Sequence, residues 1–492
     1  MQERTAGNLN IVIEHYLAIG SLLLVVSILA SKTSGRIGVP ALLLFLLVGM
    51  LAGSEGFGGI YFDNFKVAQS VGIVALIDIL FSGGLDSNVS SIRSVAMGGA
   101  LLSTVGVVLT AASVGIFSHY VLNFSWLEAF LLGAIVSSTD AAAVFTVLRA
   151  GGLSLKNRLR TLLELESGSN DPLAVMLTVT LISIATRLSS GVGQVLVDFF
   201  QQLIFGALIG YLSGKIIVWL LNRLNLEFEG LYPVFTISSV ALVFSMSQFA
   251  GGNGFLSVYV LGLVLSHSRF VHKRSLVIFH DGIAWLSQIV MFLCLGLLVF
   301  PSQLPPIALP ALSLVAFLIF VARPLGVFVS LVGQGYSLRE KLFVSWVGLR
   351  GSVPIILATY PLVAGISEAS KIFNIVFFVV VVSVALQGTT LGWATKLFKV
   401  ESSEKPRARY PIEFIPGTHS KNELLEIEIS STSSKVGKSL FQLSLPKNVL
   451  IVLMQRRGET LIPNGATVFE SGDSLLILAD LKQASFIRQL FS

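Results

Sequence analysis

Residues 161–186 read TLLELESGSNDPLAVMLTVTLISIAT and decide the fold, because the carboxylates Glu164, Glu166 and Asp171 stand inside an otherwise apolar block. An apolar block of this length can cross the roughly 30 Å hydrocarbon core of a bilayer as a helix. A charge at the bilayer centre costs about 2.5–3.5 kcal/mol even on insertion scales, so residues of this kind usually serve a function. The stretch therefore predicts a transmembrane helix built around a polar site.

The rest of the chain has the composition of a polytopic membrane protein. Of its 492 residues, 54% are hydrophobic and only 12% are charged, whereas about a quarter of the residues are charged in soluble domains. Apolar blocks of roughly 20 residues recur up to about residue 398. They predict about thirteen transmembrane helices, near residues 11–31, 39–53, 67–84, 95–121, 126–149, 161–186, 196–221, 231–250, 254–268, 277–300, 307–332, 341–363 and 372–398.

The positive charges predict how these helices are oriented. Lys and Arg concentrate in the loops that follow the odd-numbered spans, and the positive-inside rule makes those loops cytoplasmic. We therefore expect the N-terminus outside and the C-terminus in the cytoplasm. The same rule explains the net charge of +6, so the expected partner is the lipid bilayer and not a nucleic acid.

Beyond the transmembrane domain, predicted to cover residues 1–399, the chain changes character. Residues 400–420 are rich in Ser, Lys, Pro and Arg and are interpreted as a linker. Residues 421–492 show the alternation typical of strands at 424–429, 449–453 and 474–478, with a helix expected near 481–491. This pattern predicts a small cytosolic α+β domain, whose limited core favours dimerisation.

The polar residues of the opening stretch share faces of their predicted helix. Glu166 and Asn170 are four residues apart, as are Ser167 and Asp171, and residues at that spacing lie on one side of a helix. Hydroxyl, amide and carboxylate oxygens are hard ligands that suit a monovalent cation or a proton. Ser167, Asn170 and Asp171 are therefore candidate ion-binding residues.

Two further polar stretches predict broken helices. Residues 137–143 read SSTDAAA on the fifth span, and residues 348–354 read GLRGSVP on the twelfth. Spans separated by seven run in opposite directions, which is typical of inverted repeats whose broken helices meet at the membrane midplane. Half-helix ends there carry partial charges that Asp140 and Arg350 could neutralise. A close-packed helix pair is the alternative explanation for the glycines.

These motifs resemble those of the monovalent cation:proton antiporter family 1, in its NhaP-like branch of bacterial sodium/proton and potassium/proton exchangers. The resemblance covers most of residues 11–398 and implies a bacterial inner-membrane protein with a dimerisation part and a mobile core part. It rests on four motifs in order, namely Thr139-Asp140, Glu166-Ser167 with Asn170-Asp171-Pro172, Ala322-Arg323-Pro324 and Gly348-Leu349-Arg350-Gly351.

The resemblance implies an ion site centred on one residue. Asp171 would be the carboxylate shared by the cation and the proton, with Thr139, Asp140 and Ser167 around it. The family also places an acidic side chain on the third span near the ion. Asp78 is a candidate for that position, on a looser match of the surrounding sequence.

Other charged residues would be structural by the same resemblance. Glu166 would pair with Arg323 as a bridge between helices. Arg350 would balance the partial charges where the broken helices cross.

The last part of the chain resembles the ligand-binding C-terminal regulator domain of potassium transport systems. The agreement runs through residues 434–440, 457–459, 461–465 and 471–473. In that family the domain dimerises and senses a small nucleotide or ions. The resemblance implies a homodimer and a nucleotide effector whose binding residues are unknown, and it favours potassium as the transported ion.

The combined prediction is a secondary antiporter, not an enzyme, without a resident cofactor. A proton and a potassium or sodium ion would compete for Asp171 in an alternating-access cycle. Asn170 cannot hold a proton, and a single titrating carboxylate favours electroneutral, one-for-one exchange. A regulated potassium channel and a carrier of another small solute are the alternatives. The chain has no Thr-Val-Gly-Tyr-Gly filter, and its polar cluster has no aromatic clamp for an organic solute.

Overall fold

The structure, a computed structural model, describes most of the chain as two units. One unit comprises residues 1–269 and 275–404, and the other comprises 270–274 and 405–492. The described residues are 2–37, 40–87, 92–186, 192–224, 226–402 and, with short gaps, 422–491. Most of the predicted linker therefore lies outside the described residues, as do Ser434, Arg457 and Gly458 of the regulator motifs.

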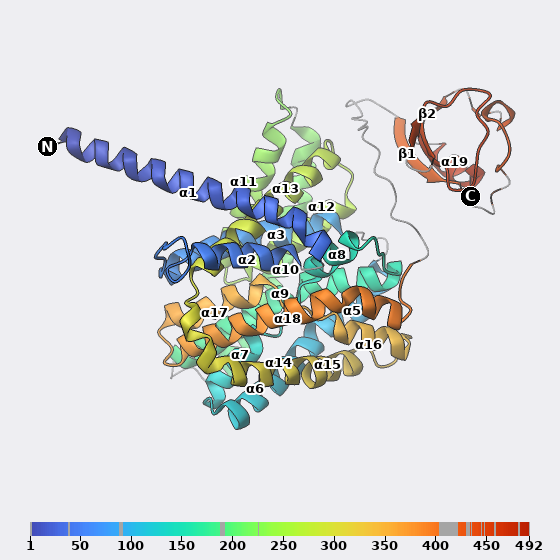
Figure 1. Ribbon diagram of the computed structural model, residues 1–492. Helices are drawn as coiled ribbons and strands as arrows, with labels where there is room; N and C mark the ends of the chain where they lie inside the picture. Colours follow the sequence, from blue (N-terminus) through green and yellow to red (C-terminus); the bar gives the residue numbers. More distant parts are fainter. Residues whose placement is uncertain are drawn as a thin grey trace. The chain divides into compact units, whose positions relative to one another are not determined.

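The first unit consists of helices (Figure 1). Within the described residues, eight helices are long and apolar enough to cross a membrane, so this is a polytopic helical membrane protein. Its unbroken helices are α1 (Gln2–Ile37), α2 (Ala41–Ala52), α3 (Phe65–Asp86), α9 (Asn157–Thr186), α10 (Val192–Arg223), α11 (Leu231–Phe249), α12 (Gly254–His267), α13 (Lys273–Leu297) and α18 (Ala369–Leu397).

Two of the long spans contain a π-helical turn. In the fourth predicted span, η1 (Leu102–Gly106) joins α5 (Ala96–Leu101) to α6 (Val107–Leu122). In the eleventh, η4 (Leu318–Ala322) joins α14 (Ala308–Phe317) to α15 (Arg323–Ser330). Such turns occur often at functional sites, and the second one ends directly before Arg323. Short 3₁₀ turns, η2 (Pro301–Gln303) and η3 (Pro305–Ile307), precede α14.

The fifth and twelfth predicted spans are interrupted. Their halves are α7 (Trp126–Ile135) and α8 (Ala141–Ala150), then α16 (Leu338–Trp346) and α17 (Ser352–Ala364). Each first half begins with a Ser-x-x-Glu capping box, from Ser125 and Glu128 in α7 and from Ser337 and Glu340 in α16. Serine and glutamate satisfy backbone N–H groups at the helix start. Each of the thirteen predicted ranges thus holds a helix or a broken pair, while the number of membrane crossings stays a prediction.

Glycines bring α3 and α12 into close contact. A Cβ added to Gly84 would lie 2.6 Å from the Tyr259 carbonyl oxygen and 3.1 Å from the Gly262 Cα. Only a residue without a side chain fits between two backbones at this distance. This contact fixes the position of α12, which also packs against α9, α10 and α11.

The second unit is a small α/β domain. Four antiparallel strands in the order β1-β4-β2-β3 form its sheet, namely β1 (Asn422–Glu428), β2 (Val449–Arg456), β3 (Glu459–Leu461) and β4 (Ser474–Asp480), followed by α19 (Ala484–Phe491). Leu425, Met454 and Ile477 of the sheet pack with Ile487 and Phe491 of α19. The three strands and the closing helix expected from the sequence are present, and β3 and the one-turn η5 (Leu440–Leu443) are additional.

Candidate cation-binding site

Asp171 is a buried carboxylate in the middle of α9. Its side chain is 7% exposed, and the Ser138 hydroxyl donates a hydrogen bond to its Oδ1. Ser138 belongs to the non-helical segment between α7 and α8. The carboxylate of α9 therefore accepts a hydrogen bond from the non-helical segment between α7 and α8.

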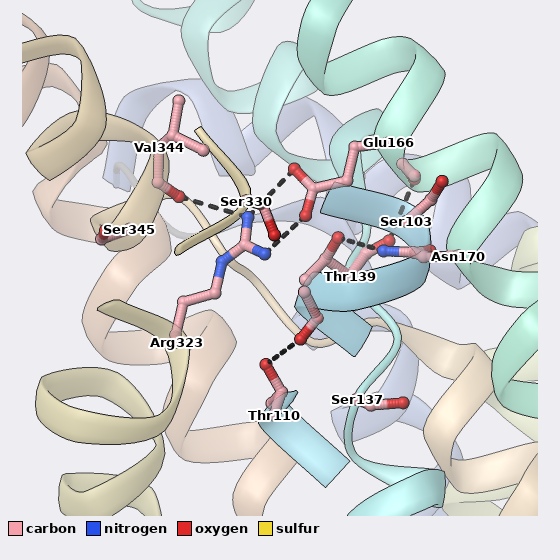
Figure 2. A network of polar contacts seen from close by, with 12 residues as sticks. Ser103, Thr110, Ser137, Thr139, Glu166, Asn170, Arg323, Ser330, Val344 and Ser345 are labelled. Carbon is pink, nitrogen blue, oxygen red and sulfur yellow. Dashed lines mark hydrogen bonds and ion pairs between the residues drawn. The ribbon is translucent and has the colours of Figure 1, made fainter. Parts of the chain in front are cut away.

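The same interruption is bound by two more side chains of α9. The Asn170 Nδ2 donates to the Thr139 Oγ1 at 2.6 Å, as Figure 2 shows. The Ser167 hydroxyl donates to the Thr139 carbonyl oxygen at 3.0 Å and accepts from the Ala141 N–H at 3.1 Å. Ser167, Asn170 and Asp171 thus lie together against residues 138–141.

Asp140 begins the second half of the broken helix. Its Oδ1 accepts the Ala143 N–H at 3.0 Å, as the N-cap of α8, and its own N–H donates to the Leu349 carbonyl oxygen at 2.8 Å. A Cβ at Gly351 would collide with the Asp140 carboxylate. A negative charge is favourable at a helix N-terminus, so the carboxylate stabilises α8 and faces the other broken helix.

Arg350 contacts the opposite half-helix. Its Nη1 donates to the carbonyl oxygens of Ser137 at 2.8 Å and Ser138 at 2.6 Å. These carbonyls follow the C-terminus of α7, where partial negative charge collects. Ser383 and Gln387 of α18 bind the backbone at Arg350 and Trp346 respectively, and no sequence pattern predicted either contact. The non-helical segments of the two broken helices are therefore joined by hydrogen bonds to backbone groups as well as by charged side chains.

Glu166 and Arg323 form a two-point ion pair. The Nη1 and Nη2 of Arg323 lie 2.5 and 3.0 Å from the two oxygens of Glu166 (Figure 2). Both side chains are buried, with Arg323 5% and Glu166 2% exposed. Arg323 also donates to the Val344 carbonyl oxygen at 3.3 Å, which joins α9 and α15 to α16.

Asp78 of α3 makes a separate contact. The Ser287 hydroxyl of α13 donates to its Oδ2 at 3.0 Å. Asp78 is not among the residues that line the cavity at Asp171, although Ile79 and Ser82 of the same helix are. The structure therefore gives Asp78 a partner on α13, and no described contact joins it to Asp171.

A cavity of about 210 Å³ reaches Asp171 and Asp140. Ser167 and Ser352 also line it, and among its other charged residues Asp86, Glu164 and Asp281 are acidic while Arg149 is basic. A mostly acidic lining attracts cations, and Asp171, Asp140, Ser167 and Ser352 offer carboxylate and hydroxyl oxygens. The arrangement can bind a small cation or a proton. No sequence pattern predicted a role for Ser138 or for the cavity-lining Tyr259, and only its position next to Thr139 could have pointed to Ser138.

Comparison with known proteins agrees with this chemistry. The sodium/hydrogen exchanger, transmembrane, family model matches residues 21–397, and the TrkA-C domain model matches residues 424–492. The K(+)/H(+) antiporter NhaP of Alkalimonas amylolytica is 40% identical over 94% of this chain and 81% of that protein. The K(+)/H(+) antiporter NhaP2 of Shewanella sp. strain ANA-3 is 42% identical over 98% and 84%.

A solved structure is similar as well. The sodium proton antiporter MjNhaP1 from Methanocaldococcus jannaschii superimposes with a TM-score of 0.69 at 26% sequence identity. The match covers 78% of this chain and 99% of that chain.

Proposed function

Since this chain belongs to the sodium/hydrogen exchanger family and is a cation:proton antiporter, we propose that it exchanges potassium for protons by alternating access around Asp171. Two relatives that match over most of their length are named K(+)/H(+) antiporters. The TrkA-C match favours the same cation. Sodium remains the second candidate, because MjNhaP1 is named a sodium proton antiporter.

The observation that carries this proposal is the buried Asp171 carboxylate that lines the cavity. A carboxylate in an apolar interior needs a neutralising partner. A proton or a cation can neutralise it, but they cannot both do so at once. Binding of one ion therefore releases the other, and alternate exposure of the site to the two sides makes the protein an exchanger.

The neighbours of Asp171 support electroneutral exchange. Asn170 donates to Thr139 and has no titratable proton. The Asp140 carboxylate is already engaged at the N-terminus of α8, where a negative charge is stabilised. One carboxylate then alternates between a proton and a monovalent cation, so the proposed ratio is one to one.

The two broken helices support an inverted-repeat architecture. Asp140 and Leu349 join them through a backbone hydrogen bond, and Arg350 binds the carbonyls that end α7. Because the half-helix ends are neutralised within this pair, the pair and α9 can move as one body. We propose that this body carries Asp171 between its inward and outward positions.

Regulation by the C-terminal domain is proposed to act through the start of the linker. The Ser402 N–H donates to the Ser154 carbonyl oxygen at 2.8 Å, and the Lys156 N–H donates to the Val400 carbonyl oxygen at 3.2 Å. Leu155 and Glu401 form an antiparallel bridge between these bonds. Residues 154–156 connect α8, which begins at Asp140, to α9, which carries Asp171. A nucleotide or ion bound to the domain could thus restrain both helices.

We also propose the cellular setting. The Lys and Arg distribution supports an N-terminus outside and a C-terminus in the cytoplasm, and the bacterial relatives support the inner membrane. A homodimer is proposed because exposed apolar side chains such as Leu208 and Leu212 of α10 leave a surface for a second copy or lipid.

Replacement of Asp171 by Asn tests the proposal. In liposomes with the purified chain, a potassium gradient should drive proton movement in the wild type, and Asp171→Asn should abolish it. Asp198→Asn is the matched control, because Asp198 lies on α10 and accepts a hydrogen bond only from Gln194 among the described contacts. Exchange by Asp171→Asn at the wild-type rate would refute the site. Electrical recording separates a channel from an exchanger, because a channel passes current without moving protons.

A further inference from the structure

Tyr259 of α12 faces the polar segment of α9. Its ring lies against Gly168, where an added Cβ would collide with the ring. Gly168 is one helical turn before Asp171. Tyr259, Gly168 and Asp171 all line the same cavity, so the tyrosine approaches the ion site from a helix outside the two broken pairs.

The hydroxyl of Tyr259 is buried and has no hydrogen bond. The side chain is 3% exposed, and among the described residues its oxygen has no hydrogen-bond partner. The hydroxyl groups of Ser87 and Ser169 lie close enough to interact with it, but neither contact has the geometry of a full hydrogen bond. Buried hydroxyl groups are normally paired, and Phe would give the same packing without an unpaired oxygen. The phenol oxygen therefore has hydrogen-bonding capacity that no described contact uses, and its residue lines the cavity.

The position of this hydroxyl is fixed. The backbone of α12 at Tyr259 touches α3 at Gly84, and the ring fills the space at Gly168. An aromatic side chain held on both sides cannot move its hydroxyl far. A fixed neutral oxygen that shares a cavity with a carboxylate is a suitable ligand for a cation that has lost part of its water shell.

We propose that the Tyr259 hydroxyl oxygen is a further ligand of the transported cation, together with Asp171. This inference rests on the proposed function of Asp171 and adds a residue from α12. The phenol contributes lone pairs without a charge, so it strengthens cation binding and leaves the one-to-one exchange unchanged. A proton on Asp171 needs no such ligand. Tyr259 therefore changes the affinity of the site for the cation and not its affinity for the proton.

Tyr259→Phe is the appropriate variant, because it removes the oxygen and keeps the ring. In liposomes, we expect the KM for potassium to rise about fivefold, as loss of one neutral contact implies, with the maximal rate nearly unchanged. At subsaturating potassium the exchange rate falls as the pH is lowered, and this acid limb of the rate-pH profile should move to higher pH in the variant. The reason is that protons displace a weakly bound cation more easily. A purely structural defect would lower the rate without moving that limb.

Tyr232→Phe is the matched control. Tyr232 is a buried tyrosine of α11 whose hydroxyl donates to the Leu224 carbonyl oxygen at 2.6 Å, outside the cavity. Its loss should lower thermal stability and leave the KM unchanged. A second measurement is the stabilisation of purified protein by potassium chloride relative to choline chloride, which Tyr259→Phe should weaken.

The outcomes separate the two proposals. If Asp171→Asn abolishes exchange while Tyr259→Phe keeps the wild-type KM and acid limb, the tyrosine is not a ligand and the proposed function stands. If Asp171→Asn still exchanges, the proposed function fails, and the inference about Tyr259 fails with it.

Discussion

The hydroxyl of Ser138 donates a hydrogen bond to the carboxylate of Asp171. The two residues are far apart in the sequence and meet because α7 ends at Ile135, which leaves Ser138 in a non-helical segment beside α9. A change in this segment can therefore alter the proposed ion site directly.

Replacement of Ser138 by Ala should weaken cation binding. The variant loses the only hydrogen bond described for the Asp171 side chain, and one of the hydroxyl oxygens beside it. We expect the KM for potassium to rise about fivefold to tenfold, measured by exchange in liposomes. Ser137→Ala is the control, because the Ser137 hydroxyl donates to the Ala134 carbonyl oxygen of its own helix. Equal KM values for the two variants would contradict the prediction.

Replacement of Arg323 by Leu should destabilise the fold. It leaves the Glu166 carboxylate buried without its partner, and breaking a buried ion pair in this way costs about 3–5 kcal/mol. Thermal unfolding of the purified protein measures the loss. Arg160→Leu breaks a more exposed pair with Glu164, in which the arginine side chain is 49% and the glutamate side chain 24% exposed, and should cost less than Arg323→Leu.

A paired replacement makes the same prediction sharper. Glu166→Leu together with Arg323→Leu removes both charges and should recover much of the stability that the single change loses. A double variant less stable than Arg323→Leu would show that Glu166 has another essential partner.

Replacement of Ser402 by Pro should disconnect the regulator domain from the transport helices. Proline has no N–H, so the bond to the Ser154 carbonyl oxygen is lost. The exchange rate of Ser402→Pro should equal that of a chain truncated after Glu404. Ser402→Ala keeps the N–H and should behave as the full-length wild type. If Ser402→Pro also matches the full-length wild type, the bridge has no regulatory role.

Replacement of Arg456 by Met should loosen the C-terminal domain. Arg456 donates to both oxygens of the buried Asp473, at 2.9 and 2.7 Å, and pairs with Glu470. Loss of the charged hydrogen bonds should cost about 1.5–3 kcal/mol. Limited proteolysis of the full chain should cut the variant domain faster, whereas Lys438→Met serves as a surface control.

The pH dependence of this contact has a definite sign. The hydrogen bond with Asp473 raises the pKa of Arg456, so its contribution to stability is complete below the ordinary arginine pKa. It is lost only as the pH rises through the still higher folded value. Arg456 therefore stays protonated from roughly pH 6 to pH 9. The proteolytic resistance of the wild-type domain should not change over that range through Arg456.

Much of the fold could be predicted from local patterns. The apolar blocks predicted a polytopic protein, and the alternation at 474–478 predicted the central strand β4. The capping boxes at Ser125 and Ser337 could be recognised from the residues alone. The three-residue β3 could not, because its exposed residues carry no hydrophobic alternation.

The candidate site was predictable in part. Helical periodicity places Ser167, Asn170 and Asp171 on adjoining faces of α9. In the unwound segment no such periodicity applies, so the sequence could not tell which of Ser138, Thr139 and Asp140 meets Asp171. The fold turns Ser138 to the carboxylate.

By itself, the sequence determined that this protein is a membrane-embedded helical chain with carboxylates inside its spans and a small α/β domain at its end. Hydrophobic block length and residue periodicity depend only on neighbouring residues, which is why they could be read directly. Only the tertiary structure decided that Asp140 caps a helix, that Asp78 contacts α13, and that Tyr259 borders the cavity at Asp171. These contacts depend on how separate helices pack, and packing distances are not encoded in the spacing along any one helix.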